Sequence, residues 1–415
     1  MEVKNEPSDQ SVTEEVEDKI RNKNTMNNII STIKPELILE YCYGIYRFQL
    51  VDGELRTASW KYIALGGCII LAYVSLFFNF IRYPATINQI GDFVDMMDEF
   101  PTVVVLIQYI TTALTASCYV SKVNIRIFTS LQELDTNLQI ATSTDFYKQL
   151  RSRFIISLIL LVMSHLLNGL LDMISTPDFV WGIIVSPLYF MQKLQAFIFC
   201  VYVYMVQYRL QVINNYLRVF IQEQKKKTVT VFTIKNKKKV VPETSLNFIG
   251  RPSEENVKIQ NLASMYDSIG NICSMINQVF NYQIFMTLVS TFVYTVVTIW
   301  TSIYFFRKPH NLNQLINIGI WCFGMISNII IMSFICERLL SVRTKTKVLV
   351  NKLIMNYDLP ITMRVQAKAF MELVEVWPLR IYIYDMFSVD ITLMLKFISV
   401  STTYLIVIVQ VSHFL

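Results

Sequence analysis

Charged side chains are scarce in this sequence. Asp, Glu, Lys and Arg make up 16% of its 415 residues, against about 25% in ordinary soluble domains. Glycine and proline are also few, with 11 of each. In contrast, 53% of the residues are hydrophobic and 13% are aromatic. This length and this apolarity together indicate an all-α membrane protein with several spanning helices.

Motifs for catalysis and metal binding are missing. The three histidines, His165, His310 and His413, are far apart, and no HExxH or Cys/His spacing typical of zinc sites is present. There is no phosphate-binding GxxxxGK[ST] loop, no GxSxG elbow and no pair of carboxylates inside a span. The sequence therefore predicts no enzyme, no cofactor, no metal site and no nucleic-acid partner. A receptor, a channel or a scaffold remains.

Paired cysteines are also missing. Five of the seven cysteines lie in apolar stretches, and Cys42 and Cys273 fall in polar segments between them. This placement brings no two of them together in an oxidising compartment, so we expect no disulfide framework.

Seven stretches are long and apolar enough to cross a bilayer, which needs about 20 residues of helix. The last one, beginning at Met386, has no charged residue from Phe397 onward. The seven stretches are 62–81, 101–121, 154–171, 179–208, 282–306, 311–336 and 386–415.

Lys and Arg are distributed very unevenly around these spans. Segments 1–61, 122–153, 209–281 and 337–385 hold 32 of the 37 basic residues, while the alternate loops hold only Arg82, Arg307 and Lys308. Basic residues favour the cytoplasmic side of a membrane. We therefore expect a cytoplasmic N-terminus and an extracellular C-terminus.

The segments between spans predict the remaining organisation. We expect a disordered tail over 1–33, because it is polar and acidic, and an interfacial segment over Ile33–Glu54 that leads into the first span. The Lys-rich insert Lys225–Lys239 fits a solvated loop or one attracted to anionic lipid. The resulting divisions are 1–33 (tail), 34–208 (pre-helix and spans 1–4), 209–281 (inner loop with helix extension), 282–336 (spans 5 and 6), 337–385 (inner anchor helices) and 386–415 (last span).

One face of the last span is unusually polar. Its positions step by three or four residues, which keeps them on one side of a helix. In lipid such a face must meet protein or water, so it fits either contact between helices or the lining of an aqueous path. The face comprises Thr392, Lys396, Ser399, Thr403, Val407, Gln410 and Phe414.

The C-terminal tail resembles the signature of the insect gustatory receptors, which is Thr-Tyr, five hydrophobic residues and Gln-Phe. Thr403, Tyr404 and Gln410 match this motif, while Val411 replaces the usual phenylalanine. The segment 385–390, the pair Arg209 and Asn214, and the pair Cys336 and Glu337 also resemble the family at the ends of its spans. The resemblance extends over the seven-span plan.

This resemblance implies a ligand-gated, non-selective cation channel in the plasma membrane of gustatory neuron dendrites. The subunits would form a homo- or heterotetramer around one pore, held together by an anchor of inner helix ends. By the same resemblance Thr403 and Gln410 line the pore, and Val407 and Val411 form an apolar gate that excludes water and cations when closed.

The resemblance further implies a pocket for a small organic tastant among the outer halves of the second to sixth spans. Aromatic side chains with a few polar groups suit a mostly apolar ligand, although each one alone also fits ordinary packing, and Lys193 also fits a lysine that extends towards the interface. The candidates are His165, Asn168, Trp181, Tyr189, Gln192, Lys193, Tyr294, Trp300, Asn317 and Trp321.

Three sequence features bear on the class of ligand. Sugar receptors of the family often have an acidic residue after Thr-Tyr, but Leu405 occupies that position here. The segment 385–390 and the Lys-rich loop resemble the bitter-type receptors of moths and butterflies. A fructose-type receptor of the same family is the alternative. A G-protein-coupled receptor would need an extracellular N-terminus, against the charge distribution, and a transporter would usually show internal repeats.

Overall fold

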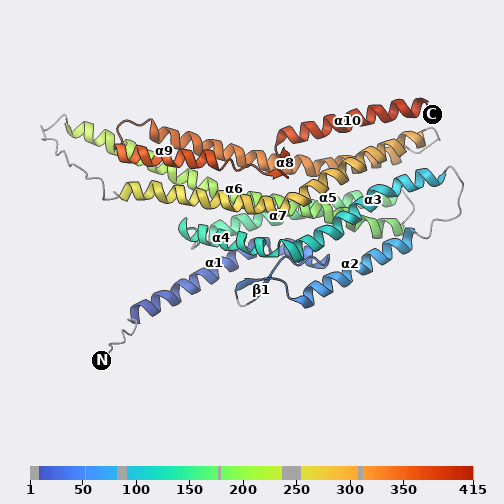
Figure 1. Ribbon diagram of the computed structural model, residues 1–415, viewed down its shortest axis with the longest axis horizontal. Coiled ribbons are helices and arrows are strands. Elements are labelled where there is room, and N and C mark those ends of the chain that lie inside the picture. The colour runs from blue at the N-terminus through green and yellow to red at the C-terminus, as the bar shows by residue number, and fades with distance from the viewer. Residues whose placement is uncertain are drawn as a thin grey trace.

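The computed structural model describes residues 9–51, 53–81, 91–141, 143–175, 179–235, 254–306 and 312–414. This part of the chain is almost entirely helical (Figure 1). Its elements are α1 (Asp9–Cys42), β1 (Gln49–Val51), β2 (Glu54–Arg56), α2 (Trp60–Ile81), α3 (Gly91–Leu114), the π-helical turn η1 (Thr115–Tyr119), α4 (Ser121–Asn137), α5 (Thr144–Ser175), α6 (Phe179–Lys235), α7 (Glu254–Phe306), α8 (Leu312–Ile354), α9 (Ile361–Val376), β3 (Tyr382–Ile383), β4 (Phe387–Ser388) and α10 (Ile391–Phe414).

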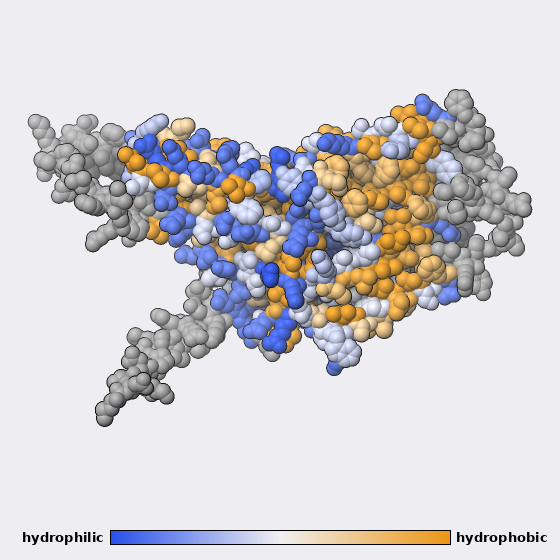
Figure 2. Space-filling view, in the orientation of Figure 1, coloured by the Kyte–Doolittle hydropathy of each residue, from blue (hydrophilic) through white to orange (hydrophobic). Residues whose placement is uncertain are grey.

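Seven helices are long and apolar enough to cross a membrane: α2, α3 with η1, α5, α6, α7, α8 and α10. This confirms the predicted number of spans. They run roughly along the long axis of the molecule, with the N- and C-termini at opposite ends (Figure 1). Apolar side chains gather over the half that contains α10 and the ends of α2 and α3, and polar ones over the other half (Figure 2). The chain is a multi-pass membrane protein.

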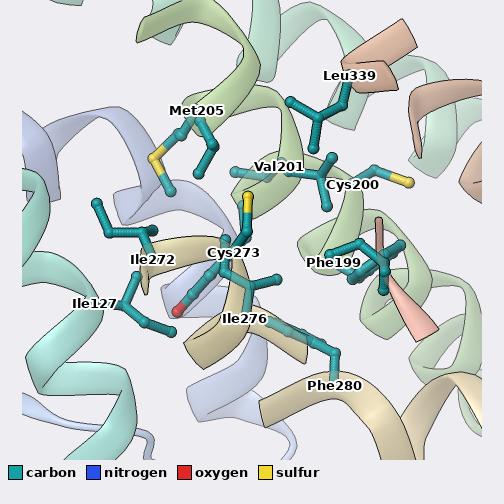
Figure 3. Close-up of a cluster of buried hydrophobic side chains, with 14 of the residues drawn as sticks. Ile127, Phe199, Cys200, Val201, Met205, Ile272, Cys273, Ile276, Phe280 and Leu339 are labelled. Atoms are coloured by element: carbon teal, nitrogen blue, oxygen red, sulfur yellow. The ribbon is translucent and has the colours of Figure 1, made fainter. Parts of the chain in front are cut away.

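Three helices are much longer than a bilayer requires. The helices α6, α7 and α8 have 57, 53 and 43 residues, whereas a span needs about 20. Their extra turns pack with α4 and α9 in the polar half of the molecule. Buried apolar side chains join the extensions to the spans, among them Met205 on α6, Ile272 and Ile276 on α7, and Leu339 on α8 (Figure 3).

The segment predicted to be a disordered tail contains most of α1, which corrects that prediction. Met26, Ile29, Ile30 and Ile33 are buried, with 1–7% of their surface exposed. These residues recur every three to four positions, so they form one apolar stripe, and α1 packs against α4 and α5. The prediction failed because the polar composition of residues 1–28 concealed this short stripe.

The segment after α1 is also placed differently from the interfacial position expected for Ile33–Glu54. Residues 45–48 are all buried, with Phe48 only 1% exposed. The Tyr46 amide donates to Ser117 Oγ on η1 at 3.1 Å, and Ser121 Oγ donates to the Arg47 carbonyl at 2.6 Å. The segment therefore inserts between helices, because its polar groups find partners at the junction of α3 and α4.

All seven cysteines are free thiols, as the sequence predicted. The two hairpins, β1–β2 and β3–β4, are short and antiparallel. The second hairpin leads into α10, where the Val389 amide donates to the Ile381 carbonyl at 2.8 Å. This hairpin also docks on α7, because the side chains of Asn277 and Asn281 accept hydrogen bonds from the amides of Tyr382 and Tyr384. It thereby fixes the start of the last span.

Candidate functional site

A buried lysine lies inside the membrane-spanning half, between α5, α6 and α8. Lys193 is 14 residues into α6, about 21 Å along that helix, and only 4% exposed. Its Nζ atom lies 5.2 Å from the centre of the Trp321 ring, a cation–π contact. A Cβ atom built on Gly324 would lie 3.5 Å from this Nζ and 3.4 Å from Asn168 Nδ2. Two nitrogen donors therefore converge beside a residue that has no side chain.

Aromatic rings surround this lysine. The Trp321 ring contacts those of Tyr189 and His165 at 5.6 and 6.1 Å between centres, and Tyr189 contacts Tyr294 at 5.4 Å. Such edge and tilted arrangements are favoured between aromatic rings. We use the name Lys193 cluster for His165, Asn168, Tyr189, Gln192, Lys193, Tyr294 and Trp321. Seven of the ten predicted pocket residues are in it.

The other three predicted pocket residues are not placed in the cluster. Trp300 is half-buried on α7, six residues beyond Tyr294. The side chains of Trp181 and Asn317 lie outside the described part of the structure. The structure therefore brings together predicted residues from α5, α6, α7 and α8.

Two polar atoms of the Lys193 cluster have no hydrogen-bond partner within the described residues: His165 Nδ1 and Gln192 Oε1. The second polar atom of each side chain does have a partner. His165 Nε2 lies 3.0 Å from Ser186 Oγ, and Gln192 Nε2 donates to Ser290 Oγ at 2.7 Å. Buried polar groups without partners are uncommon and costly. They mark this cluster as a candidate binding site.

A chain of hydrogen bonds extends from the cluster to α3, and sequence reasoning did not identify it. Ser290 Oγ donates to Gln108 Oε1 at 2.8 Å, and Gln108 Nε2 donates to Thr287 Oγ1 at 3.0 Å. Gln108 is separated by 179 residues from Thr287. An unusual glutamine within an apolar span was the available signal, because polar side chains in spans face the protein interior.

The polar face of α10 is turned away from the rest of the chain. Its six described members are exposed, and Val407 is 49% exposed. The opposite side of α10 packs on the chain, with Leu393 and Ser401 buried and the Tyr404 ring 5.4 Å from that of Phe292 on α7. The polar members of this face are therefore not contacts between helices of one chain. The side chain of Val411, a predicted gate residue, and that of Phe414 lie outside the described part.

The start of α10 is fixed by an acidic cap. Asp390 Oδ1 accepts from the Leu393 amide at 3.1 Å, and Oδ2 accepts from Ser388 Oγ at 2.7 Å. Burial alone would raise the pKa of Asp390, but these hydrogen bonds lower it below its usual value. A charged carboxylate at the helix N-terminus stabilises α10 and its direction.

Two buried ion pairs lie nearer the polar half. Arg47 Nε donates to both oxygens of Glu40 at 2.9–3.0 Å, and its Nη2 donates to Gln195 Oε1 at 2.7 Å. Arg209 donates to both oxygens of Asp135 at 2.6 Å. Burial would lower the pKa of Arg47, but Glu40 raises it above its usual value, so the guanidinium stays charged. These arrangements hold helices together.

The comparisons with known proteins agree with this architecture. A profile of the 7tm chemosensory receptor family matches residues 37–412. The structure is similar to that of the insect olfactory receptor OR5 from Machilis hrabei, with a TM-score of 0.64 and 12% identity, covering 93% of this chain and 99% of that chain. The structure of OR5 in complex with eugenol matches with a TM-score of 0.62 and 12% identity, over 91% of this chain and 97% of that chain. A search of the curated proteins found no match.

Proposed function

Because the chain belongs to the 7tm chemosensory receptor family, we propose that it is a gustatory receptor that opens a cation-conducting pore when a small organic compound binds. Its N-terminus and the extensions of α6, α7 and α8 face the cytoplasm, as the basic residues indicate. Four subunits surround one pore in the plasma membrane, and α9 with the helix extensions forms the anchor between them.

The observation that supports this proposal most is the exposed polar face of α10. In a single chain Thr403, Val407 and Gln410 are exposed, although polar groups in lipid are costly. Placing this face around a central pore gives Gln410 and Thr403 water to bind. Val407 then forms an apolar ring that excludes water in the closed state, as do the Val411 side chains beside it.

The ligand site is the Lys193 cluster. It combines aromatic rings with a few buried polar groups, as small-molecule sites usually do. The similarity to a receptor structure in complex with eugenol supports a small organic ligand. Among tastants, Leu405 after the Thr-Tyr pair favours bitter or other non-sugar plant compounds over sugars. The ligand opens the pore because it binds the open state more tightly than the closed one.

Whole-cell recording tests the proposal. Cells that express this chain alone, with G-protein signalling blocked, are exposed to plant bitter compounds, fructose and other sugars. We expect a rapid current that reverses near zero with a bitter compound. A response to fructose alone would assign the chain to the sugar-sensing alternative, and a response abolished by the block would refute the channel.

The gate can be tested by Val407→Ser. A hydroxyl in the apolar ring stabilises water there, so we expect a larger current without ligand than in the wild type. Ile406→Ser, on a neighbouring exposed position outside the polar face, is the matched control. Unchanged ligand-free current in Val407→Ser, with normal surface expression, would contradict the assignment of this residue.

Gln410→Ala tests the pore lining. We expect changed conductance or cation selectivity at normal surface expression, because Gln410 supplies a polar group to permeating ions. Permeation like that of the wild type would show that Gln410 instead contacts another helix of the assembly.

A further inference from the structure

We propose that the Lys193 cluster selects ligands that combine an aromatic ring with an acidic oxygen group, in the manner of an aromatic carboxylate. This inference depends on the proposed function only for the location of the ligand site. Three features of the cluster support it: the charge that it leaves uncompensated, the positions of its donor nitrogens and the rings around them.

Lys193 is a buried cation that has no acidic partner among the described residues. Its side chain is 4% exposed, and the ion pairs found among the described residues involve other groups. An ammonium group inside a membrane protein is costly unless an anion compensates it. The Trp321 ring compensates it in part. A carboxylate brought by the ligand would complete the pair.

The donors converge on one place. The contacts of Gly324 put Lys193 Nζ and Asn168 Nδ2 within 3.4–3.5 Å of the same Cβ position. A carboxylate has two oxygens and can accept from both nitrogens at once, whereas an ester has no charge to offer the ammonium. Glycine at position 324 places no side chain beside the two nitrogens, whereas a Cβ atom there would contact both.

The rings determine the rest of the ligand. The rings of Tyr189 and His165 each contact that of Trp321 beside the lysine, so an aromatic ligand would meet rings with which it interacts favourably. The unpaired His165 Nδ1 and Gln192 Oε1 are available to further polar substituents. An acid with an aromatic ring therefore matches both halves of the cluster.

Binding to the purified full-length receptor in detergent provides the test. The probes are 4-methoxycinnamate and its methyl ester, which share the ring and differ in charge, and binding is measured by the ligand-dependent rise in unfolding temperature. We expect the acid to bind the wild type about tenfold more tightly than the ester, about 1.4 kcal/mol. In Lys193→Gln this preference should vanish, because the acid loses more affinity than the ester, and in Lys193→Arg it should persist.

Gly324→Ala provides a second variant in case Lys193→Gln does not fold. Alanine favours a helix, and its methyl group would cover both nitrogens at ordinary contact distance, so we expect the acid to lose affinity several-fold and the ester to lose less. Gly319→Ala on the same helix, where a Cβ would meet nothing within 4 Å, is the control.

Three results would overturn the inference: equal affinity of the wild type for acid and ester, no binding of either probe, or an acid preference that survives both Lys193→Gln and Gly324→Ala. The channel proposal is tested separately, because binding requires no current. Acid binding that depends on Lys193 in a chain that passes no current would support the inference and contradict the pore. Currents evoked equally by acid and ester would support the channel and contradict the inference about the acidic group.

Discussion

The buried charges of this receptor fall into two groups that differ in their partners. Arg47 and Arg209 each face a carboxylate with two hydrogen bonds, although both are almost completely buried. Lys193 and Glu36 are equally buried, but no ion pair with either is found among the described residues. A paired charge fixes helices in place. An unpaired one weakens the fold and is therefore a candidate for function.

The largest expected effect is the loss of a paired charge. Asp135→Asn leaves the guanidinium of Arg209 buried without a counter-charge, so we expect a loss of about 3–5 kcal/mol in the free energy of unfolding. Thermal unfolding in detergent and surface expression measure it. Lys347→Ala breaks an exposed pair with Glu375 at 3.0 Å and is the control, expected to cost less than about 1 kcal/mol.

The double variant Asp135→Leu with Arg209→Met makes this test sharper. It removes both charges, so it should be more stable than Asp135→Asn alone. A double variant as unstable as the single one would mean that Tyr147, whose hydroxyl donates to Asp135 at 2.8 Å, depends on the carboxylate more than Arg209 does.

The next largest effect on stability is expected for Glu36, and it depends on pH. Burial, against a backbone hydrogen bond that lowers it and with a smaller contribution from the nearby Glu40 carboxylate, raises the pKa of Glu36 from 4.5 to about 7. The folded state therefore binds the proton more tightly than the unfolded state. Stability is full below pH 4.5, decreases as the pH rises through 7, and is then lower by about 3 kcal/mol.

Glu36→Gln tests this dependence. The amide stays neutral, so we expect a variant that is as stable as the wild type in acid and more stable than it at pH 8. Unfolding temperatures of both proteins between pH 5 and pH 8 measure the difference. Parallel curves would show that Glu36 does not titrate in this range.

The sequence predicted the spans but not the partners of the buried charges. Each span is a local apolar run of the sequence, which is why all seven could be predicted and are found in the structure. The two partners of Arg47 lie at very different distances along the sequence, because Glu40 is seven residues away and Gln195 is 148 residues away. No local pattern connects such positions, so the segment 43–48 was predicted to lie at the membrane surface rather than between helices.

In the Lys193 cluster, too, single residues stand out in the sequence but the contacts between them do not. His165, Tyr189 and Lys193 could be predicted as site residues because ionisable and aromatic groups within spans are unusual. The approach of Lys193 and Asn168 to Gly324, and the link through Ser290 to Gln108, depend on how α3, α5, α6, α7 and α8 pack. The sequence therefore supplied candidates that stay predictions as ligand contacts, and the structure adds the distances between them.

The smallest effect is expected for the unpaired lysine, and its sign should be opposite to that of the paired arginine. Lys193→Met replaces an ammonium by an apolar side chain of similar length, so we expect the unliganded receptor to gain about 1 kcal/mol in stability. Arg209→Met, at a paired site, should lose stability instead. Both are measured by thermal unfolding without ligand. A loss of stability in Lys193→Met would show that the contact of Nζ with Trp321 at 5.2 Å already compensates the charge, and that the lysine serves the fold as Arg209 does.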